Sequence, residues 1–261
     1  MRALQIAATG MDAQQTRVEV ISNNIANMST TAYNARRAEF ADLHYQQVEA
    51  AGSVNATTGA VLPAGVQIGL GVRTTAVAMN VEQGGLRATG GDLDLALEGD
   101  GYFEVQLPTG ESAYTRDGAF KMTGDGQIVT SDGYPLIPEI TIPVDARQVS
   151  INSEGQVFVY FEGNPQAQEI GAITLADFVN EMGLEAIGSN LYRETEASGA
   201  PTIGEAGVDG RGTMRQGYLE ASSVDVVAEI SELIEAQRGY ELNSKIITAA
   251  DQMLQATTQV R

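Results

Sequence analysis

The sequence predicts an α+β protein, with a long helix at each end and a central antiparallel β-rich domain. Near the N-terminus, apolar side chains recur every seven residues, at Leu4, Met11, Val18 and Ile25. Near the C-terminus the same spacing is repeated at Val226, Leu233, Tyr240, Ile247 and Leu254. Such spacing lines one side of a helix and suits packing along another helix. We therefore predict that the two terminal helices pack as a coiled-coil-like bundle.

The first helix should end within Asn23–Asn27, where a polar stretch begins whose side chains compete with the helical backbone. We assign residues 1–31 to this first segment. Residues 32–65 follow, and their first part, residues 32–45, should be irregular or form a short helix. Their second part, residues 46–65, is poor in large apolar groups, which indicates a loop or an extended excursion.

Residues 66–216 change from helical spacing to a period of two, which predicts the β-rich domain. Leu93, Leu95 and Leu97 alternate with acidic residues, and turn sequences such as Gly124-Asp125-Gly126 recur along the segment. Short antiparallel strands joined by tight turns give this pattern. The clearest expectations are strands at Tyr102–Leu107 and Val157–Phe161, a short helix within 174–190 and a loop at 197–213.

Residues 217–261 form the last segment and contain the second long helix. Either Ser222 or Ser223 should cap its N-terminus, and it should end near Thr258. Gly239 within it costs about 1 kcal/mol relative to alanine. Burial of the apolar positions of the seven-residue repeat, at roughly 1.5–3 kcal/mol each, outweighs that cost.

Composition limits the kinds of partner. The chain has 261 residues, a net charge of −19 and no cysteine. Residues 41–219 carry −16 of that charge, which argues against nucleic acid or an anionic membrane as partner, although solubility alone also explains it. No apolar run approaches the roughly 18 residues of a membrane span, so we expect no membrane insertion. The first residues also lack the pattern of a cleaved secretory signal.

No catalytic, cofactor or metal site emerges from the sequence. His44 is the only histidine, and without cysteine it cannot build the usual zinc site or a histidine-based nucleophile. Asp92 and Asp94 share a face of a predicted strand and are best explained as its solvated side. The rival class, a carbohydrate-active enzyme, needs two carboxylates roughly 5–10 Å apart, and no pair here demands that reading. We expect a protein that is not an enzyme.

The seven-residue repeats have two explanations. Any long amphipathic helix that packs on its own domain shows apolar residues at these offsets. The companion positions on the last helix are, however, polar: Gln237, Ser244, Asp251 and Thr258. Such a helix is too polar for a self-sufficient two-stranded zipper, and further apolar residues widen its hydrophobic surface. This combination favours a bundle formed between chains.

The sequence also resembles the bacterial flagellar rod and hook proteins along its whole length. The N-terminal motif of that family is matched by Asn23–Asn27 with Ser29, Thr30 and Tyr33, and the C-terminal motif by Gln237–Lys245 and Asp251–Leu254. The β-domain hallmarks are matched by Gly99–Phe103 and Tyr114–Phe120. Two positions depart from the family pattern, with Ala32 replacing a usual glycine and Gly239 a common alanine.

Within the family, three segments favour a distal rod subunit, with a proximal rod subunit as the alternative: Gln67–Val72, Gly183–Glu185 and Asn190–Tyr192. The resemblance implies a helical homopolymer, a hollow shaft that transmits torque from motor to hook and passes exported subunits. It implies proximal rod and hook proteins at the two ends, surrounding P- and L-ring proteins and type III export without a cleaved signal. The shaft would lie in the periplasmic space. Residues 46–65 lie where distal rod subunits have a segment associated with rod straightness.

Overall fold

The chain forms two compact units in a computed structural model that describes residues 2–50, 64–162 and 164–259. The helix–ribbon unit comprises Met1–Ala26, Arg36–Ala78 and Asp225–Arg261. The β unit comprises Asn27–Ala35 and Met79–Val224.

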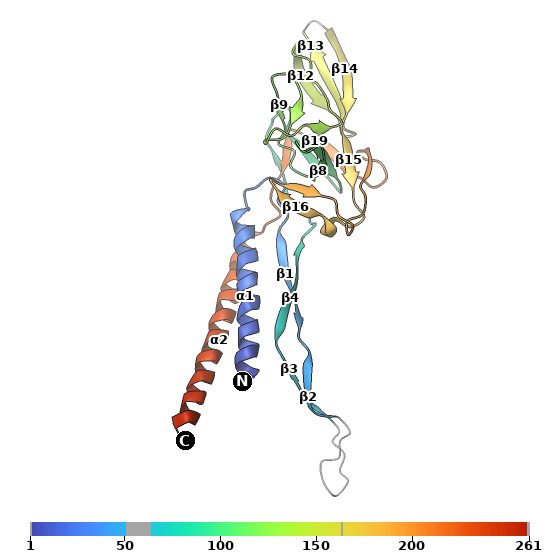
Figure 1. Ribbon diagram of the computed structural model, residues 1–261. Coiled ribbons are helices and arrows are strands. Elements are labelled where there is room, and N and C mark those ends of the chain that lie inside the picture. Colours follow the sequence, from blue (N-terminus) through green and yellow to red (C-terminus); the bar gives the residue numbers. More distant parts are fainter. Residues whose placement is uncertain (1, 51–63, 163, 260–261) are drawn as a thin grey trace. The chain divides into compact units, whose positions relative to one another are not determined.

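Both predicted terminal helices are confirmed and belong to the helix–ribbon unit. α1 spans Arg2–Ala26 and α2 spans Val226–Gln259. They lie side by side and run in opposite directions (Figure 1). The Arg17 guanidinium of α1 lies 3.2 Å from the Glu232 carboxylate of α2 and contributes one link between them.

The N-cap of α2 is Asp225, so the prediction of a serine cap is wrong. The Asp225 carboxylate accepts hydrogen bonds from the backbone N–H groups of Val227 (2.9 Å) and Ala228 (3.3 Å). Its negative charge also suits the positive end of the helix dipole. The Ser223 hydroxyl instead accepts the N–H of Ala35 within the β unit.

A narrow β ribbon completes the helix–ribbon unit. Its strands are β1 Arg36–Asp42, β2 Tyr45–Glu49, β3 Val66–Gly69 and β4 Val72–Met79. β1 is hydrogen-bonded to β4, and β2 pairs with β3 in antiparallel register with Tyr45 opposite Gly69. The expected irregular or helical start of residues 32–65 is therefore wrong for 36–42, which are a strand.

The ribbon also moves a predicted domain boundary. Residues 66–78, which we expected in the β-rich domain, belong to the helix–ribbon unit. The two strands in this segment, β3 and β4, pair with β2 and β1 rather than with the central strands. Most of the predicted excursion, residues 51–63, lies outside the described residues.

The β unit is built from short strands, as its spacing of turns predicted. They are β5 Leu86–Ala88, β6 Leu95–Glu98, β7 Tyr102–Gln106, β8 Ser112–Thr115, β9 Lys121–Met122, β10 Ile128–Val129, β11 Leu136–Ile137, β12 Ala146–Ile151, β13 Gln156–Phe161, β14 Asn164–Ala172, β15 Thr174–Asp177, β16 Glu185–Gly188, β17 Leu191–Arg193, β18 Thr202–Glu205, β19 Thr213–Gln216 and β20 Tyr218–Glu220. The largest sheet has the order β16-β17-β8-β7-β15-β18, with β11 also beside β7. Its pairs are antiparallel.

The predicted strands β7 and β13 are confirmed, and both contribute to the core. Phe103 of β7 and Val157 of β13 are fully buried in one hydrophobic cluster. The predicted short helix within 174–190 is confirmed as a 3₁₀ helix, Glu181–Gly183, which lies between β15 and β16. The prediction of a loop at 197–213 is wrong for Thr202–Glu205, which form β18. Tertiary strand pairing decided these segments, because their own residues give no strong local preference.

The segment Asn27–Ala35 is anchored within the β unit. The N–H of Ala32 donates to the carbonyl of Glu220 (2.9 Å), and the N–H of Ser223 donates to the carbonyl of Tyr33 (3.0 Å). Ala32 is buried and has a φ of 51°, in the left-handed region. Glycine adopts that region without strain, which fits the glycine that the family resemblance implies at this position.

Candidate self-association surface

Small residues form the contact between α1 and α2. Ala7 of α1 and Ala236 of α2 are buried. Close approach is also marked at two glycines. A Cβ atom added to Gly10 would lie 2.8 Å from the side chain of Asn243, and one added to Gly239 would lie 3.1 Å from that of Gln14. The helix axes can therefore lie close together. Most of the larger apolar side chains lie beside this contact, whereas Ile21 of α1 is buried.

The predicted association residues flank the small-residue contact. Leu4, Met11, Val18, Ile25, Val226, Leu233, Ile247 and Leu254 are half-buried, and Tyr240 is 45% exposed. Val18 and Tyr240 line one groove between the two helices, of about 400 Å³. Residues seven apart lie on nearly the same face of a helix, so each repeat continues along this side of its helix. Association between chains through these residues remains a prediction.

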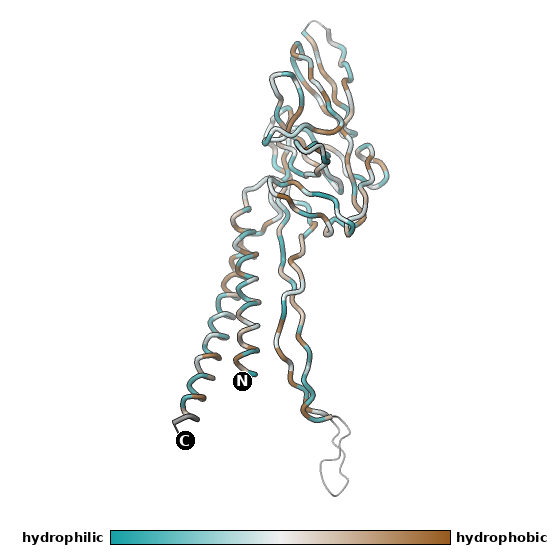
Figure 2. The backbone as a smooth tube through the Cα atoms, in the orientation of Figure 1, coloured by the Kyte–Doolittle hydropathy of each residue, from teal (hydrophilic) through white to brown (hydrophobic). Residues whose placement is uncertain are grey.

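Helix α2 also exposes large apolar side chains on other sides. Val227 is 76% exposed, and exposures of 45–65% are found at Ile230, Ile234, Leu242, Ile246 and Met253. Hydrophobic positions recur along the whole of α2 (Figure 2). A helix that is apolar on several sides suits a bundle in which it has several helical neighbours. Within the described residues, α1 covers only one of those sides.

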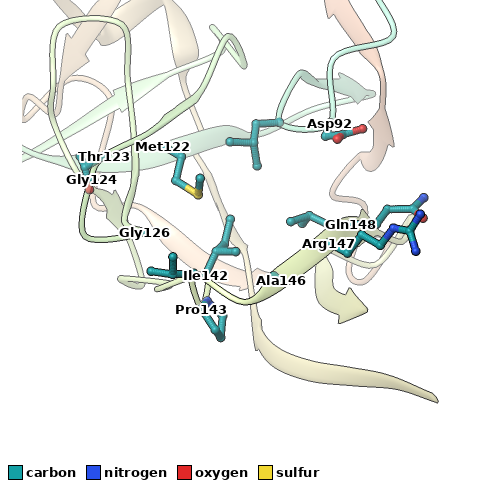
Figure 3. Close-up of a pocket in the computed structure, with 13 residues that line it drawn as sticks. Asp92, Met122, Thr123, Gly124, Gly126, Ile142, Pro143, Ala146, Arg147 and Gln148 are labelled. Atoms are coloured by element: carbon teal, nitrogen blue, oxygen red, sulfur yellow. The ribbon is translucent and has the colours of Figure 1, made fainter. Parts of the chain in front are cut away.

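A hollow in the β unit lacks the side chains that a catalytic site would need. It has a volume of about 350 Å³, and its lining includes Met122, Ile142 and one carboxylate, that of Asp92. Figure 3 shows Arg147 and Gln148 together at one end and Thr123 at the other. The lining has no second carboxylate and no histidine. It provides neither an acid–base pair nor a nucleophile with its base.

Charge differs between the two units. The β unit contains 23 acidic and 7 basic residues, a net charge of −16. The helix–ribbon unit contains 11 acidic and 8 basic residues, a net charge of −3. A nearly neutral helical unit favours close association, because like charges repel as surfaces approach. The strongly charged β unit is better suited to contact with water.

Asn24 joins three segments of the helix–ribbon unit. Its side chain is buried, and its Oδ1 accepts the N–H of Arg36 (2.9 Å). Its Nδ2 donates to the carbonyl of Arg36 (2.8 Å) and to the carboxylate of Glu229 (2.8 Å). One amide therefore links α1, β1 and α2. Burial raises the pKa of Glu229, and the hydrogen bond from Asn24 opposes that rise.

We expect Asn24→Asp to destabilise the helix–ribbon unit by about 3 kcal/mol at pH 7. The aspartate loses both donor bonds and sets a buried carboxylate against the half-buried Glu229. Burial and mutual repulsion raise the folded-state pKa values of this carboxylate pair above their unfolded values. The folded variant then binds more protons, so its stability rises as pH falls through those raised pKa values.

Urea denaturation between pH 7 and pH 4 measures this effect. Ser22→Asp is the matched control, because it adds the same charge at an exposed position two residues earlier and should change stability by about 0.5 kcal/mol or less. An Asn24→Asp chain as stable as the Ser22→Asp chain at pH 7 would show that the amide is not an important link.

The described residues contain no group of three or more His, Cys, Asp or Glu side chains arranged to hold a metal ion. Among these residues there is also no helix with both the length and the hydrophobicity to span a bilayer.

Three family descriptions match the chain, in the order of its segments. Residues 4–33 match "Flagella basal body rod protein", residues 96–159 match "Flagellar hook protein FlgE/F/G D1 domain", and residues 215–260 match "Flagellar basal body rod FlgEFG protein C-terminal". The first and last matches cover most of α1 and all of α2, which make the small-residue contact.

Curated relatives match over the full length. The chain is 54% identical to the flagellar basal-body rod protein FlgG of Caulobacter vibrioides, over 100% of both chains. It is 50% identical to FlgG of Agrobacterium fabrum, over 97% of both chains. It is 39% identical to FlgG of Bacillus subtilis, over 100% of this chain and 99% of that one. The chain therefore belongs to the FlgG family of flagellar basal-body rod proteins.

Proposed function

We propose that this chain is the structural subunit of the flagellar distal rod. It polymerises helically into a rigid, hollow shaft that transmits torque from motor to hook and passes exported subunits. The observation that carries this proposal is the apolar surface of α2 that α1 leaves uncovered, at Val227, Ile234 and Leu242 among others. Exposed apolar surface of this extent marks an interaction site. Relatives named as flagellar basal-body rod proteins support the same assignment.

The helical unit supplies the contacts between copies. Eight of the predicted residues are half-buried in the single chain, so a neighbouring copy can bury them further. Burying a side chain such as Leu233 fully contributes roughly 1.5–3 kcal/mol, part of which one chain already gains. Residues of both repeats together make an interface of several such contributions. The coiled-coil-like packing predicted for the terminal helices belongs to this assembled state.

The double replacement Leu233→Asp with Ile247→Asp tests this function. Each aspartate places a charge on the surface that must be desolvated in the polymer, so we expect rod assembly and motility to be lost. The β unit should remain folded, which near-UV circular dichroism of the purified chain measures. Motility in a strain that lacks its own copy measures function.

The matched control replaces two exposed valines of the β unit, Val144 and Val179, by aspartate. The chemical change is similar, but the helices are untouched, so assembly should persist. Normal rods built from the Leu233→Asp, Ile247→Asp chain would refute the proposal.

The position in the flagellum follows from the same proposal. We place the subunit in the periplasmic part of the basal body, between proximal rod proteins and the hook protein and inside the P- and L-rings. It reaches that place by flagellar type III export, without cleavage of a signal. Residues 46–65 contribute to rod straightness. An epitope tag located by electron microscopy on purified basal bodies separates this from the alternative, a proximal rod subunit, because the label would then lie at the motor end.

A further inference from the structure

The groove between α1 and α2 has an apolar floor and an acidic rim. Val18 and Tyr240 line it together with two amide side chains, and the carboxyl groups of Glu19 and Glu241 complete the lining. No basic residue lines the groove. Glu19 accepts a hydrogen bond from Gln15 (3.0 Å). Among the ion pairs of the described residues, none involves Glu19 or Glu241.

The far side of α2 carries the complementary chemistry. Each residue turns an α-helix by about 100°, so Ile234 and Arg238 lie roughly opposite Ala236, which is buried in the contact between the helices. Val227 lies seven residues before Ile234, and Lys245 seven after Arg238, which continues the same face. We call these four residues the α2 ridge. All are exposed, and neither basic residue forms an ion pair within the part of the chain that the structure describes.

We infer that the α2 ridge of one copy sits in the α1–α2 groove of a second copy. The apolar residues of the ridge cover Val18 and Tyr240, and Arg238 and Lys245 face Glu19 and Glu241. The occupant is a second copy because this chain itself supplies both complementary surfaces. This inference rests on the proposed function and specifies one contact within the polymer.

Such a contact joins two different surfaces, so it does not close on itself as a twofold dimer does. Each copy that fills a groove presents its own groove for the next copy. Repetition of a contact of this kind with a constant rotation produces an open helical polymer. The charged pairs at the rim fix which surfaces meet, because like charges placed there repel each other.

Charge reversal tests the inference. We expect Arg238→Glu and Glu19→Arg each to reduce polymer about tenfold or more, since each sets like charges across the contact. The double variant should restore assembly. Co-expression of the two single variants should restore it as well, because every groove of one variant then matches the ridge of the other. Sedimentation of polymer and motility in a strain that lacks its own copy are the measurements.

Lys121→Glu in the β unit is the matched control, because it changes the net charge by the same amount as Arg238→Glu at another exposed position and should assemble normally. Far-ultraviolet circular dichroism of each chain shows that the helices persist. Single variants that assemble like the control overturn the inference. Single variants that fail without rescue in either combination overturn it too. If the double variant assembles but the co-expressed single variants do not, the two charges interact within one chain. That result overturns the inferred contact between copies.

The result also separates this contact from the proposed function. If the charge reversals assemble normally while the Leu233→Asp, Ile247→Asp chain does not, the polymer uses the helices through another pair of surfaces. If both sets of variants assemble normally, the proposed function itself fails.

Discussion

Replacing Arg116 by methionine should lower the free energy of unfolding of the β unit by about 3–5 kcal/mol. The Arg116 and Glu220 side chains are 6% and 2% exposed, and their charged groups lie 3.1 Å apart. Arg116 also donates to the carbonyls of Gly99 (3.0 Å) and Gly101 (3.2 Å). Methionine keeps the apolar stem but leaves a buried carboxylate and two carbonyls without these donors. Breaking one side of a buried pair is far more damaging than losing its net attraction.

Urea denaturation of the purified chain, followed by near-UV circular dichroism, measures the loss. Arg193→Met is the matched control, because Arg193 pairs with Glu185 at 2.7 Å but both side chains are about half exposed. An exposed pair contributes little to stability, because water and salt screen its charges. Adding Glu220→Gln to Arg116→Met should recover part of the loss by removing the buried charge. Equal destabilisation by the Arg116 and Arg193 variants would contradict this account.

One added methyl group at Gly118 should be similarly damaging. A Cβ atom there would overlap the backbone carbonyl of Leu95, and a backbone group cannot turn aside as a flexible side chain can. The N–H of Leu95 in turn donates to the carbonyl of Gly118 (3.0 Å), so the two segments are held at this separation. We expect Gly118→Ala to destabilise the β unit by about 3 kcal/mol or more.

Gly124→Ala is the control, because a Cβ atom at Gly124 would meet nothing within 4 Å. That variant should stay within about 0.5 kcal/mol of the parent chain. Thermal unfolding of both variants, measured in parallel, shows whether the loss of stability comes from the close packing at Gly118 or from replacing any glycine in these turns by alanine. A Gly118→Ala chain that unfolds with the Gly124→Ala chain would count against the backbone overlap.

The terminal helices could be predicted because their signal is local. Seven-residue spacing depends only on neighbours along one helix, and it placed both helices to within a few residues. The ribbon strand at 36–42 could not be found in this way. Side chains such as Phe40 remain exposed there, so burial does not impose a period of two on the sequence. Its partner, β4, follows about 30 residues later, beyond any local pattern.

The spacing also could not tell which side of a helix meets which neighbour. Large residues such as Leu233 suggested the centre of the contact within the bundle, whereas the single chain places Ala236 and Gly239 there. Several sides of α2 are apolar, and the sequence of α2 alone does not determine which of them packs against α1. The cap was likewise ambiguous from sequence, since Ser223 and Asp225 both accept N–H groups and only Asp225 bonds within the helix.

The two glycines of the α1–α2 contact have a further consequence, for alignment. Gly10 faces Asn243 and Gly239 faces Gln14, so each helix provides a notch for an amide of the other, four residues away from its own amide. Sliding α2 by about four residues would set each amide against a side chain larger than glycine, and in one direction it would set the two amides against each other. These two contacts therefore fix the axial alignment of α1 and α2. A fixed axial setting gives every copy the same pair of helices, which the proposed helical polymer needs if each contact is to repeat with a constant rotation.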